Sequence, residues 1–453
     1  MKKIFSISVV FLLTMGFLFA QSDDDLFGSD DDLFGDDDFL IEEVADVSAK
    51  SDLSKGVLFD NGSVKIGGNF TSEISTSFLV YADDDKSFLE HFSDTKISPN
   101  VGAYLTVDAR PTQDLRMYSK FGLRYPFKSK AVTTIDPLNY SINTDIKDWI
   151  YLKELFTDFN VADTAFFRFG LHTVTWGAGY FFSPVSDIIN TSMIDPENTS
   201  AQVDGCFNLR TQITFPDSQN CLWVYVMPAF DYAKNCAFAG KYDLVLGGWE
   251  LGLGGYWKYE AAPKVTLTAS GSVKKFNLFG EAVFQYGSDF EWDKEKDKTA
   301  IFKATAGFSY TWKDPSITLV GQYLYDGNNF EFDNETLTYL GTNPMYIKNN
   351  FTKGHNAAVA LSFGRIFGTT NLTAAVFGIV NFGREDLPPD VSALLKEYGA
   401  ESFMGSGTFS AMLNYAPTNS IKLGIGPYMT FADWDSKPDV ALKLSFTLGG
   451  GKF

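Results

Sequence analysis

The sequence contains little cysteine, with 3 in 453 residues. An odd number leaves at least one thiol unpaired within the chain, and no CxxC motif is present. The cysteines are Cys206, Cys221 and Cys236, and each has apolar neighbours. Such neighbours favour buried or lipid-facing thiols. The sequence therefore predicts no disulfide framework.

Histidine is equally scarce, and the chain has only His91, His172 and His355. No pair of them has the spacing of metal ligands. Asp and Ser are abundant, but nothing marks one of them as the partner of a histidine in a catalytic dyad. Lys and Arg are not gathered into a stripe that would bind nucleic acid. We therefore expect no enzyme activity, no metal, no cofactor and no nucleic-acid partner.

Beyond residue 20 the chain also lacks any run of 18 apolar residues, which excludes a helical membrane span. The first twenty residues are different. Lys2 and Lys3 precede an apolar run from Ile4 to Phe19, and Ala20 stands before Gln21. A basic start, an apolar run and a small residue at the cut are typical of a secretory signal peptide. The sequence predicts a cleaved signal over residues 1–20 and an exported protein.

Apolar residues are nevertheless plentiful, at 45% of the chain, and they alternate with polar ones. In segment 101–110, for example, Val101, Ala103 and Leu105 share one face, while Tyr104 and Thr106 share the other. Period two is a strand signal. The same alternation runs through 115–125, 264–273, 276–286, 300–311, 357–364, 421–426 and 440–448. A membrane β-barrel and a soluble β-sandwich would both produce it.

The lengths of the connections separate these two folds. Short turns at 112–114, 162–164, 216–219, 273–275, 313–316, 367–370 and 416–419 alternate with long polar loops at 82–98, 127–147, 174–204, 288–299, 327–354 and 383–401. Outer-membrane barrels have short periplasmic turns and long outer loops. We therefore predict an all-β, antiparallel, up-and-down transmembrane barrel over 61–453, in the outer membrane of a diderm bacterium and in contact with its lipid.

The same asymmetry predicts the number of strands. Both ends of a bacterial barrel lie in the periplasm, so the number is even. The number of strands becomes even if segment 236–259 is divided into two strands at Gly247-Gly248. This division gives 18 strands, with 16 as the alternative. Val440, Leu442 and Leu444 begin a last amphipathic strand, and the chain ends on Phe453. This ending resembles the signal that the barrel-assembly machinery recognises, provided that a bulge at 449–451 brings Phe453 onto the apolar face of the strand.

The segment before the barrel, 21–60, is strongly acidic. Residues 22–28 and 29–35 are an identical repeat, SDDDLFG, and residues 21–49 contain no Lys or Arg. A block of like charge is typical of disordered chain. We expect a solvated periplasmic segment whose Leu-Phe pairs could bind a periplasmic partner.

Charged side chains on the polar face of the strands predict a water-filled lumen. They are Arg110, Arg116, Lys120, Arg124, Glu154, Asp158, Arg168 and Glu281. A charge on the lipid face near the bilayer midplane costs about 2–4 kcal/mol, so these residues are expected to face inward and line a pore. The alternative is that they are only solvated wall residues.

Loop 174–204 is unusually apolar for an outer loop. Its distinguishing residues are Trp176, Tyr180, Phe181, Phe182 and Asp187. Aromatic side chains are poorly placed in open solvent. We therefore expect the loop either to fold into the lumen as a constriction or to cap the barrel rim.

One stretch of the chain resembles the R-x-G…W-G…P…D pattern of alginate-export-like outer-membrane porins, through Arg168-x-Gly170, Trp176-Gly177, Pro184 and Asp187. A second patch of such barrels is similar to Phe279-Gly-Glu281-Ala and Gln285-Tyr-Gly287. The resemblance implies an 18-stranded channel. Its substrate is not carried over, because this lumen mixes charge signs. We expect a porin for small hydrophilic solutes, with selectivity for particular substrates left open. A lipid transporter or a barrel that displays an adhesin is the alternative.

Overall fold

The computed structural model describes residues 57–82, 86–95, 97–136, 139–162, 164–191, 194, 199, 203–216, 218–287, 298–313, 316–327, 354–364, 366–369, 371–382, 407–418, 420–431 and 437–452, without the side chains of 127–149. The expected signal peptide, most of the acidic segment and Phe453 lie outside these residues.

The described residues form nineteen strands and three short helices, joined by turns and loops. The first part contains β1 (Phe59–Asp60), β2 (Val64–Tyr81), α3 (Phe88–Ser93), β3 (Ile97–Thr112), β4 (Leu115–Asp136), β5 (Asn139–Val161), β6 (Ala165–His172), η2 (Ser186–Ile188), β7 (Cys206–Thr214), β8 (Cys221–Met227), η3 (Ala233–Asn235) and β9 (Ala237–Leu246). The second contains β10 (Trp249–Lys258), β11 (Lys264–Val273), β12 (Phe276–Tyr286), β13 (Ala300–Lys313), β14 (Ser316–Asp326), β15 (Gly354–Phe363), β16 (Leu372–Asn381), β17 (Gly407–Thr418), β18 (Ile421–Phe431) and β19 (Asp439–Lys452).

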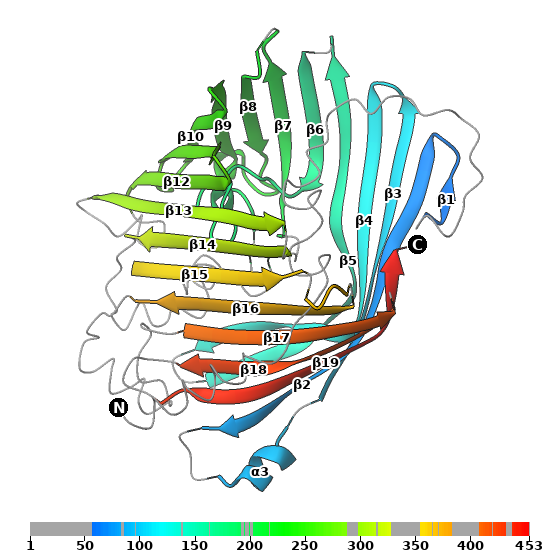
Figure 1. Ribbon diagram of the computed structural model, residues 1–453. Helices are drawn as coiled ribbons and strands as arrows, with labels where there is room; N and C mark the ends of the chain where they lie inside the picture. Colours follow the sequence, from blue (N-terminus) through cyan, green and yellow to red (C-terminus); the bar gives the residue numbers. More distant parts are fainter. Residues whose placement is uncertain are drawn as a thin grey trace.

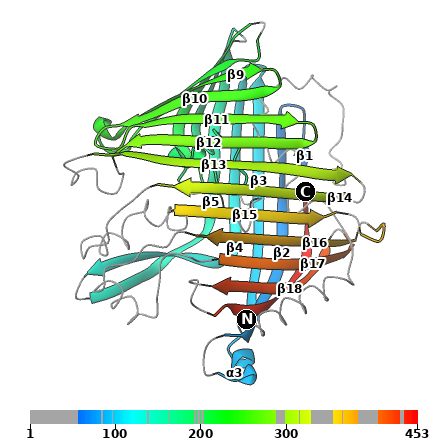
Figure 2. The same ribbon diagram turned by 60° about the vertical axis from the view of Figure 1, so that its left-hand side comes forward.

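The strands form one closed antiparallel barrel (Figures 1 and 2). From β2 onward each strand pairs with the next in sequence, and β19 pairs with β2. The described ring therefore has 18 strands, β2 to β19, which confirms the expected fold and the larger of the two strand numbers. The split that this number required is also present, because β9 and β10 are joined at Gly247 and Gly248, with φ of 60° and 84°. A tight hairpin turn needs these positive φ values.

The seam between the last and first strands contains the expected irregularity. The pairing of β19 with β2 shifts register between Thr447 and Gly450, where a bulge separates the apolar face of the strand from its glycine-rich end. The two-residue β1 pairs with the periplasmic start of β2, through Phe59 opposite Ile66. Both chain ends of the barrel therefore lie at one end of β2, as Figure 1 shows for β1 and the C-terminus.

The outward face of the wall is apolar and carries aromatic side chains at two levels. On β12 and β13, Phe276 lies against Tyr310 near the turns, and Phe284 lies against Phe302 near the long loops. Phe276 and Phe284 are eight residues apart, which is about 27 Å along a strand. With a tilt of 35–45° the levels are roughly 20 Å apart in height, close to the apolar band of a membrane barrel.

One expected loop is wrong. Segment 127–147 was expected to be a long polar loop, but β4 continues to Asp136 and β5 begins at Asn139. Cross-strand pairs such as Thr133 opposite Ile142 extend the hairpin well past the other strands (Figure 2). Threonine and isoleucine favour strands because their branched side chains suit a pleated surface. Among the described residues, no helix has the length and apolar character needed to cross a membrane.

The two faces of β2 allow a direct test of this orientation. Phe70, 40% exposed, points outward near the middle of the strand, and its neighbour Thr71 is exposed on the inward face. Phe70→Arg should lower the free energy of unfolding by about 2–4 kcal/mol, because it places a charge in lipid. Thr71→Arg is the matched control and should have little effect. Urea titration in lipid vesicles measures both, and equal losses would contradict the assigned faces.

Candidate functional site

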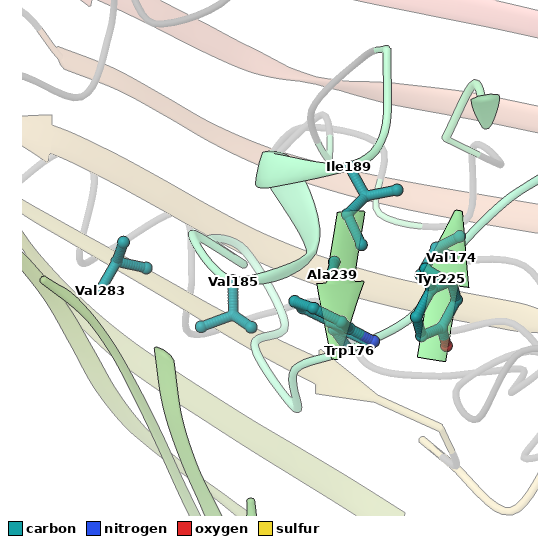
Figure 3. Close-up of a cluster of buried hydrophobic side chains, with 7 residues drawn as sticks. All are labelled: Val174, Trp176, Val185, Ile189, Tyr225, Ala239 and Val283. Carbon is teal, nitrogen blue, oxygen red and sulfur yellow. The ribbon is translucent and has the colours of Figure 1, made fainter. Parts of the chain in front are cut away.

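The described residues between β6 and β7, which are 173–191, 194, 199 and 203–205, lie inside the barrel, against the inner side of the wall. We call these residues the lumen loop. Figure 3 shows one of its contacts, in which Trp176 packs edge-on against Tyr225 of β8, with ring centroids 5.3 Å apart. Val185 of the loop belongs to the same buried cluster, and so does Val283 of β12. This part of the loop is therefore packed against the wall.

A second apolar cluster holds the next part of the lumen loop. Phe181 and Phe182 are buried with Val320 and Leu324 of β14 and with Ala358 of β15. These wall residues all have inward parity, because they alternate with exposed outward residues along their strands. The aromatic side chains that seemed too apolar for an outer loop are thus removed from water by the inner wall.

A buried carboxylate fastens the lumen loop to β12. Glu281 is 3% exposed. Its Oε1 accepts hydrogen bonds from Gly179 N at 2.7 Å and from Ser183 Oγ at 3.1 Å, and its Oε2 accepts one from Val185 N at 3.0 Å. Charge-assisted hydrogen bonds of this kind are about twice as strong as neutral ones. A single wall side chain therefore satisfies three donors of the loop.

Gln322 of β14 fastens the loop at a second point. Its Oε1 faces three successive backbone donors, Tyr180 N at 3.0 Å, Phe181 N at 2.7 Å and Phe182 N at 3.2 Å. Its Nε2 donates to Phe182 O at 2.6 Å and to Thr305 Oγ1 at 2.7 Å. Buried backbone groups without partners are costly, so these contacts are what permit irregular backbone to lie in the barrel.

Further contacts secure the two ends of the loop. Lys241 of β9 donates to Trp176 O at 2.8 Å and forms an ion pair with Asp243 at 2.9 Å. Lys153 of β5 forms an ion pair with Asp204 near the other end of the loop. Lys153 faces inward because the pairing of β4 with β5 shifts register beside it.

Two glycines allow the close approach of loop and wall. A Cβ atom on Gly177 would stand 1.9 Å from Glu281 Oε1, and one on Gly179 would stand 1.9 Å from Phe182 O. The Gly179 clash is with backbone, so a side chain is not tolerated there. A side chain at Gly177 would displace the Glu281 carboxylate from its hydrogen bonds to the loop.

A row of charges crosses the inner wall beside the loop. Arg116 of β4 lies opposite Asp158 of β5, which lies opposite Arg168 of β6, which lies opposite Arg210 of β7. Arg168 is 5% exposed and bonds both oxygens of Asp158, at 2.7 and 3.1 Å. Arg116 contacts Asp108 at 3.0 Å and Asp158 at 3.7 Å. Arg116, Asp108, Asp158 and Arg168 are thus linked by ion pairs and belong to the wall.

Two other basic side chains lie over tyrosine rings. Lys120 Nζ is 5.2 Å from the ring centre of Tyr104, and the Arg124 guanidinium is 4.6 Å from that of Tyr151. The two tyrosine hydroxyls are hydrogen-bonded to each other at 2.8 Å. A cation over an aromatic face is attracted to the ring without being neutralised by it.

No protein-family model matches this chain, and no curated protein matches it. Solved structures of similar shape include OpdK of Pseudomonas aeruginosa, solved with vanillate, which is 10% identical, with 86% of this chain and 98% of that chain covered at a TM-score of 0.49. OpdO of the same organism is 9% identical, with coverage of 86% and 97% and a TM-score of 0.49. OccAB4 of Acinetobacter baumannii is 11% identical, with coverage of 86% and 98% and a TM-score of 0.48. At these identities the likeness concerns the fold alone.

The expected pore-lining residues lie at different depths in the inner wall. Lys120 and Arg124 are half-buried on the inner face, and Arg110 is exposed at the periplasmic end of β3. The charged row contains Arg116, Asp158 and Arg168, of which the last two are buried. Glu154 is also buried, and Glu281 lies under the lumen loop. All of these residues lie on the inner face of their strands, and several of them are buried beneath other groups.

The expected loop residues lie at the inner wall. Trp176, Phe181 and Phe182 are buried there and Tyr180 is partly buried, so these aromatics anchor the loop. Asp187 lies in η2, where its backbone N donates to Ser183 O. The sequence analysis did not identify Gln322, Lys241 and Lys153 as residues that contact the lumen loop. Alternation could have placed the first two on the inner face, whereas the bulge at Lys153 has no signal in the sequence.

No metal site is present among the described residues, where no group of three or more His, Cys, Asp or Glu could hold an ion. The three cysteines are free and partly buried. Cys206 packs against the cluster around Trp176, and Cys221 Sγ lies 3.8 Å from Asp243. Both have inward parity, and neither faces lipid as one of the expected placements required.

The Gln322 contacts can be tested by truncation. Gln322→Ala removes the acceptor of three buried N–H groups, each of which costs about 1–3 kcal/mol when left unsatisfied. The loop should then become more accessible to protease, and single-channel current should become noisier, while the barrel stays folded. Thr71→Ala is the matched control, since its hydroxyl donates only to Gly102 O, at 3.5 Å. Protection of the loop in both variants would show that Gln322 does not hold it.

Proposed function

We propose that the protein is an outer-membrane channel of a diderm bacterium, through which small hydrophilic solutes diffuse with some selectivity. One observation carries the proposal. A closed ring of 18 strands encloses a lumen, and the described residues of the lumen loop contact part of its inner wall. A barrel of 16 to 18 strands is wide enough to leave an aqueous channel.

The solute path is proposed to follow the wall that the lumen loop does not touch. The described loop contacts lie on β5, β8, β9, β12 and β14 to β16. On β2, the inward residues Asn69, Thr71 and Ser77 are exposed small polar side chains. A path along β2 to β4 is therefore polar and open to water, as solute diffusion requires.

Lys120 and Arg124 border this path and are proposed to set its ion selectivity. Their side chains lie over tyrosine rings, and a cation over a ring keeps its positive charge. Arg116 belongs to the same basic row, and its guanidinium also contacts Asp108 and Asp158. We propose that the three residues together form the basic wall of this path.

The resemblance to alginate-export-like porins agrees with this proposal at the lumen loop. Arg168 and Gly170 of the shared pattern lie in β6, the strand that precedes the loop. Trp176, Gly177 and Asp187 lie in the loop itself. The pattern thus coincides with the segment proposed to narrow the pore. The nature of the solute is not transferred with the pattern.

The proposal also covers how the protein is exported and how its barrel is assembled. The segment 1–20 would direct export, and the last strand, ending in Phe453, would be recognised by the barrel-assembly machinery. The outward apolar residues of β19 and its pairing with β2 support that role, because this strand completes the barrel. The acidic segment after the signal would bind a periplasmic partner through its Leu-Phe pairs.

Deleting the loop tests the constriction. Removal of Gly179 to Asn198 takes away Tyr180, Phe181 and Phe182 and the donors that bind Glu281 and Gln322, so single-channel conductance in planar bilayers should rise. The control deletion is Phe230 to Lys234, in a connection whose Phe230 contacts the outward-facing Phe207 at 5.5 Å. A folded loop-deletion variant with unchanged conductance would place the loop outside the conducting path.

Charge removal tests the basic row. Arg116→Ser with Lys120→Ser and Arg124→Ser should lower anion permeability relative to cation permeability, because positive charge is lost beside the path. The measurement is the reversal potential in a salt gradient.

The control is Lys275→Ser, which removes the same charge from an exposed turn between β11 and β12. A reversal potential that stays constant in the triple variant would mean that the row is remote from the ions that cross the barrel.

A further inference from the structure

The connection between β2 and β3 carries α3, a six-residue helix on the long-loop side of the barrel. Helices of this length are not stable alone in water. Here the N-cap Ser87 and Glu90 form a reciprocal capping box, in which Glu90 N donates to Ser87 Oγ and Ser87 N donates to the Glu90 carboxylate. Lys86 and Asp94, on either side of the helix, form an ion pair at 2.6 Å. The helix is thus held in one conformation by its own flanks.

One face of α3 is apolar and exposed. Phe88, Leu89 and Phe92 are 57%, 75% and 64% exposed. At about 100° per residue they fall within one arc of the helix, and Glu90 and Asp94 fall on the opposite side. We call these three residues the α3 apolar face. An exposed apolar cluster with a charged rear side is typical of an interaction surface.

The α3 apolar face is continuous with the lipid-facing wall. Phe78 of β2 points outward, since it lies opposite the outward Leu442 of β19. Its ring packs edge-on against Phe88 at 5.0 Å and Phe92 at 5.6 Å. Figures 1 and 2 show α3 beyond the end of β2, outside the ring of strands. The helix therefore rests on the outer surface of the barrel at the edge of the apolar band.

We propose that α3 is an interfacial helix whose apolar face enters the outer leaflet of the membrane. Amphipathic helices lie in the headgroup region with their apolar side chains among the acyl chains and their charges toward water. The occupant is lipid because the surface beneath α3, at Phe78, is already lipid-facing. Lys86, Glu90 and Asp94 remain on the water side.

This arrangement gives α3 a mechanical role. The 82–96 connection would be fastened to the membrane surface instead of extending over the barrel mouth. The inference depends on the transmembrane fold and not on which solute the barrel conducts.

Spin labelling measures the depth of α3. The label is placed at Leu89→Cys in a chain carrying Cys206→Ala, Cys221→Ala and Cys236→Ala, and at Asp94→Cys as the matched control on the polar face. The protein is reconstituted in phosphatidylethanolamine–phosphatidylglycerol vesicles, and only samples with heat-modifiable electrophoretic mobility, hence folded barrels, are compared. Collision rates with oxygen and with a water-soluble nickel chelate are then measured. Oxygen concentrates in lipid, and the chelate stays in water.

We expect the oxygen-to-nickel ratio at Leu89 to exceed that at Asp94 several-fold. Adding Phe78→Ala should reduce the Leu89 ratio, because the aromatic support under the helix is lost. Equal ratios at Leu89 and Asp94 would place the face in water and overturn the proposal. Exclusion of both reagents from Leu89 would also overturn it, because a second copy or another protein would then cover the face.

Discussion

Backbone hydrogen bonding in hydrocarbon is the constraint on which the whole structure depends. No water is available there, so every N–H and C=O of a lipid-exposed strand must pair with a neighbouring strand. The pairing of β19 with β2 satisfies that requirement by removing the last free edges. An even number of strands and two chain ends on one side follow from this closure. The bulge near Gly450 is tolerated because it lies at the end of the seam.

The same requirement governs the inside of the barrel, where the lumen loop has no strand partners. Glu281 and Gln322 accept most of the loop donors that face the wall. The aromatic side chains of the loop supply the apolar contact that makes this position preferable to water. A loop bound in both ways has little freedom to swing aside, so its described part keeps one position against the wall.

Period-two alternation was sufficient to predict the faces of the strands, and parity of the strands was sufficient to find the turn at Gly247-Gly248. Other features depend on tertiary geometry. The alternation places Glu281 inward, but it cannot show that another segment folds over that residue. It also misplaces Lys153, because a single bulge reverses the side to which the following residues point. The extended β4–β5 hairpin was missed because polar residues were taken as a loop signal, although threonine and isoleucine favour strands.

The charged row on β4 to β7 has a consequence for assembly. Asp158 and Arg168 meet only when β5 and β6 pair in their native register. A slip of one residue would turn every side chain of the slipped strand to the opposite face, and would place a guanidinium or a carboxylate in the bilayer. The row therefore acts as a register lock that the inserting chain can satisfy in one alignment. The bidentate pair between Arg168 and Asp158 fixes β5 and β6 in this alignment.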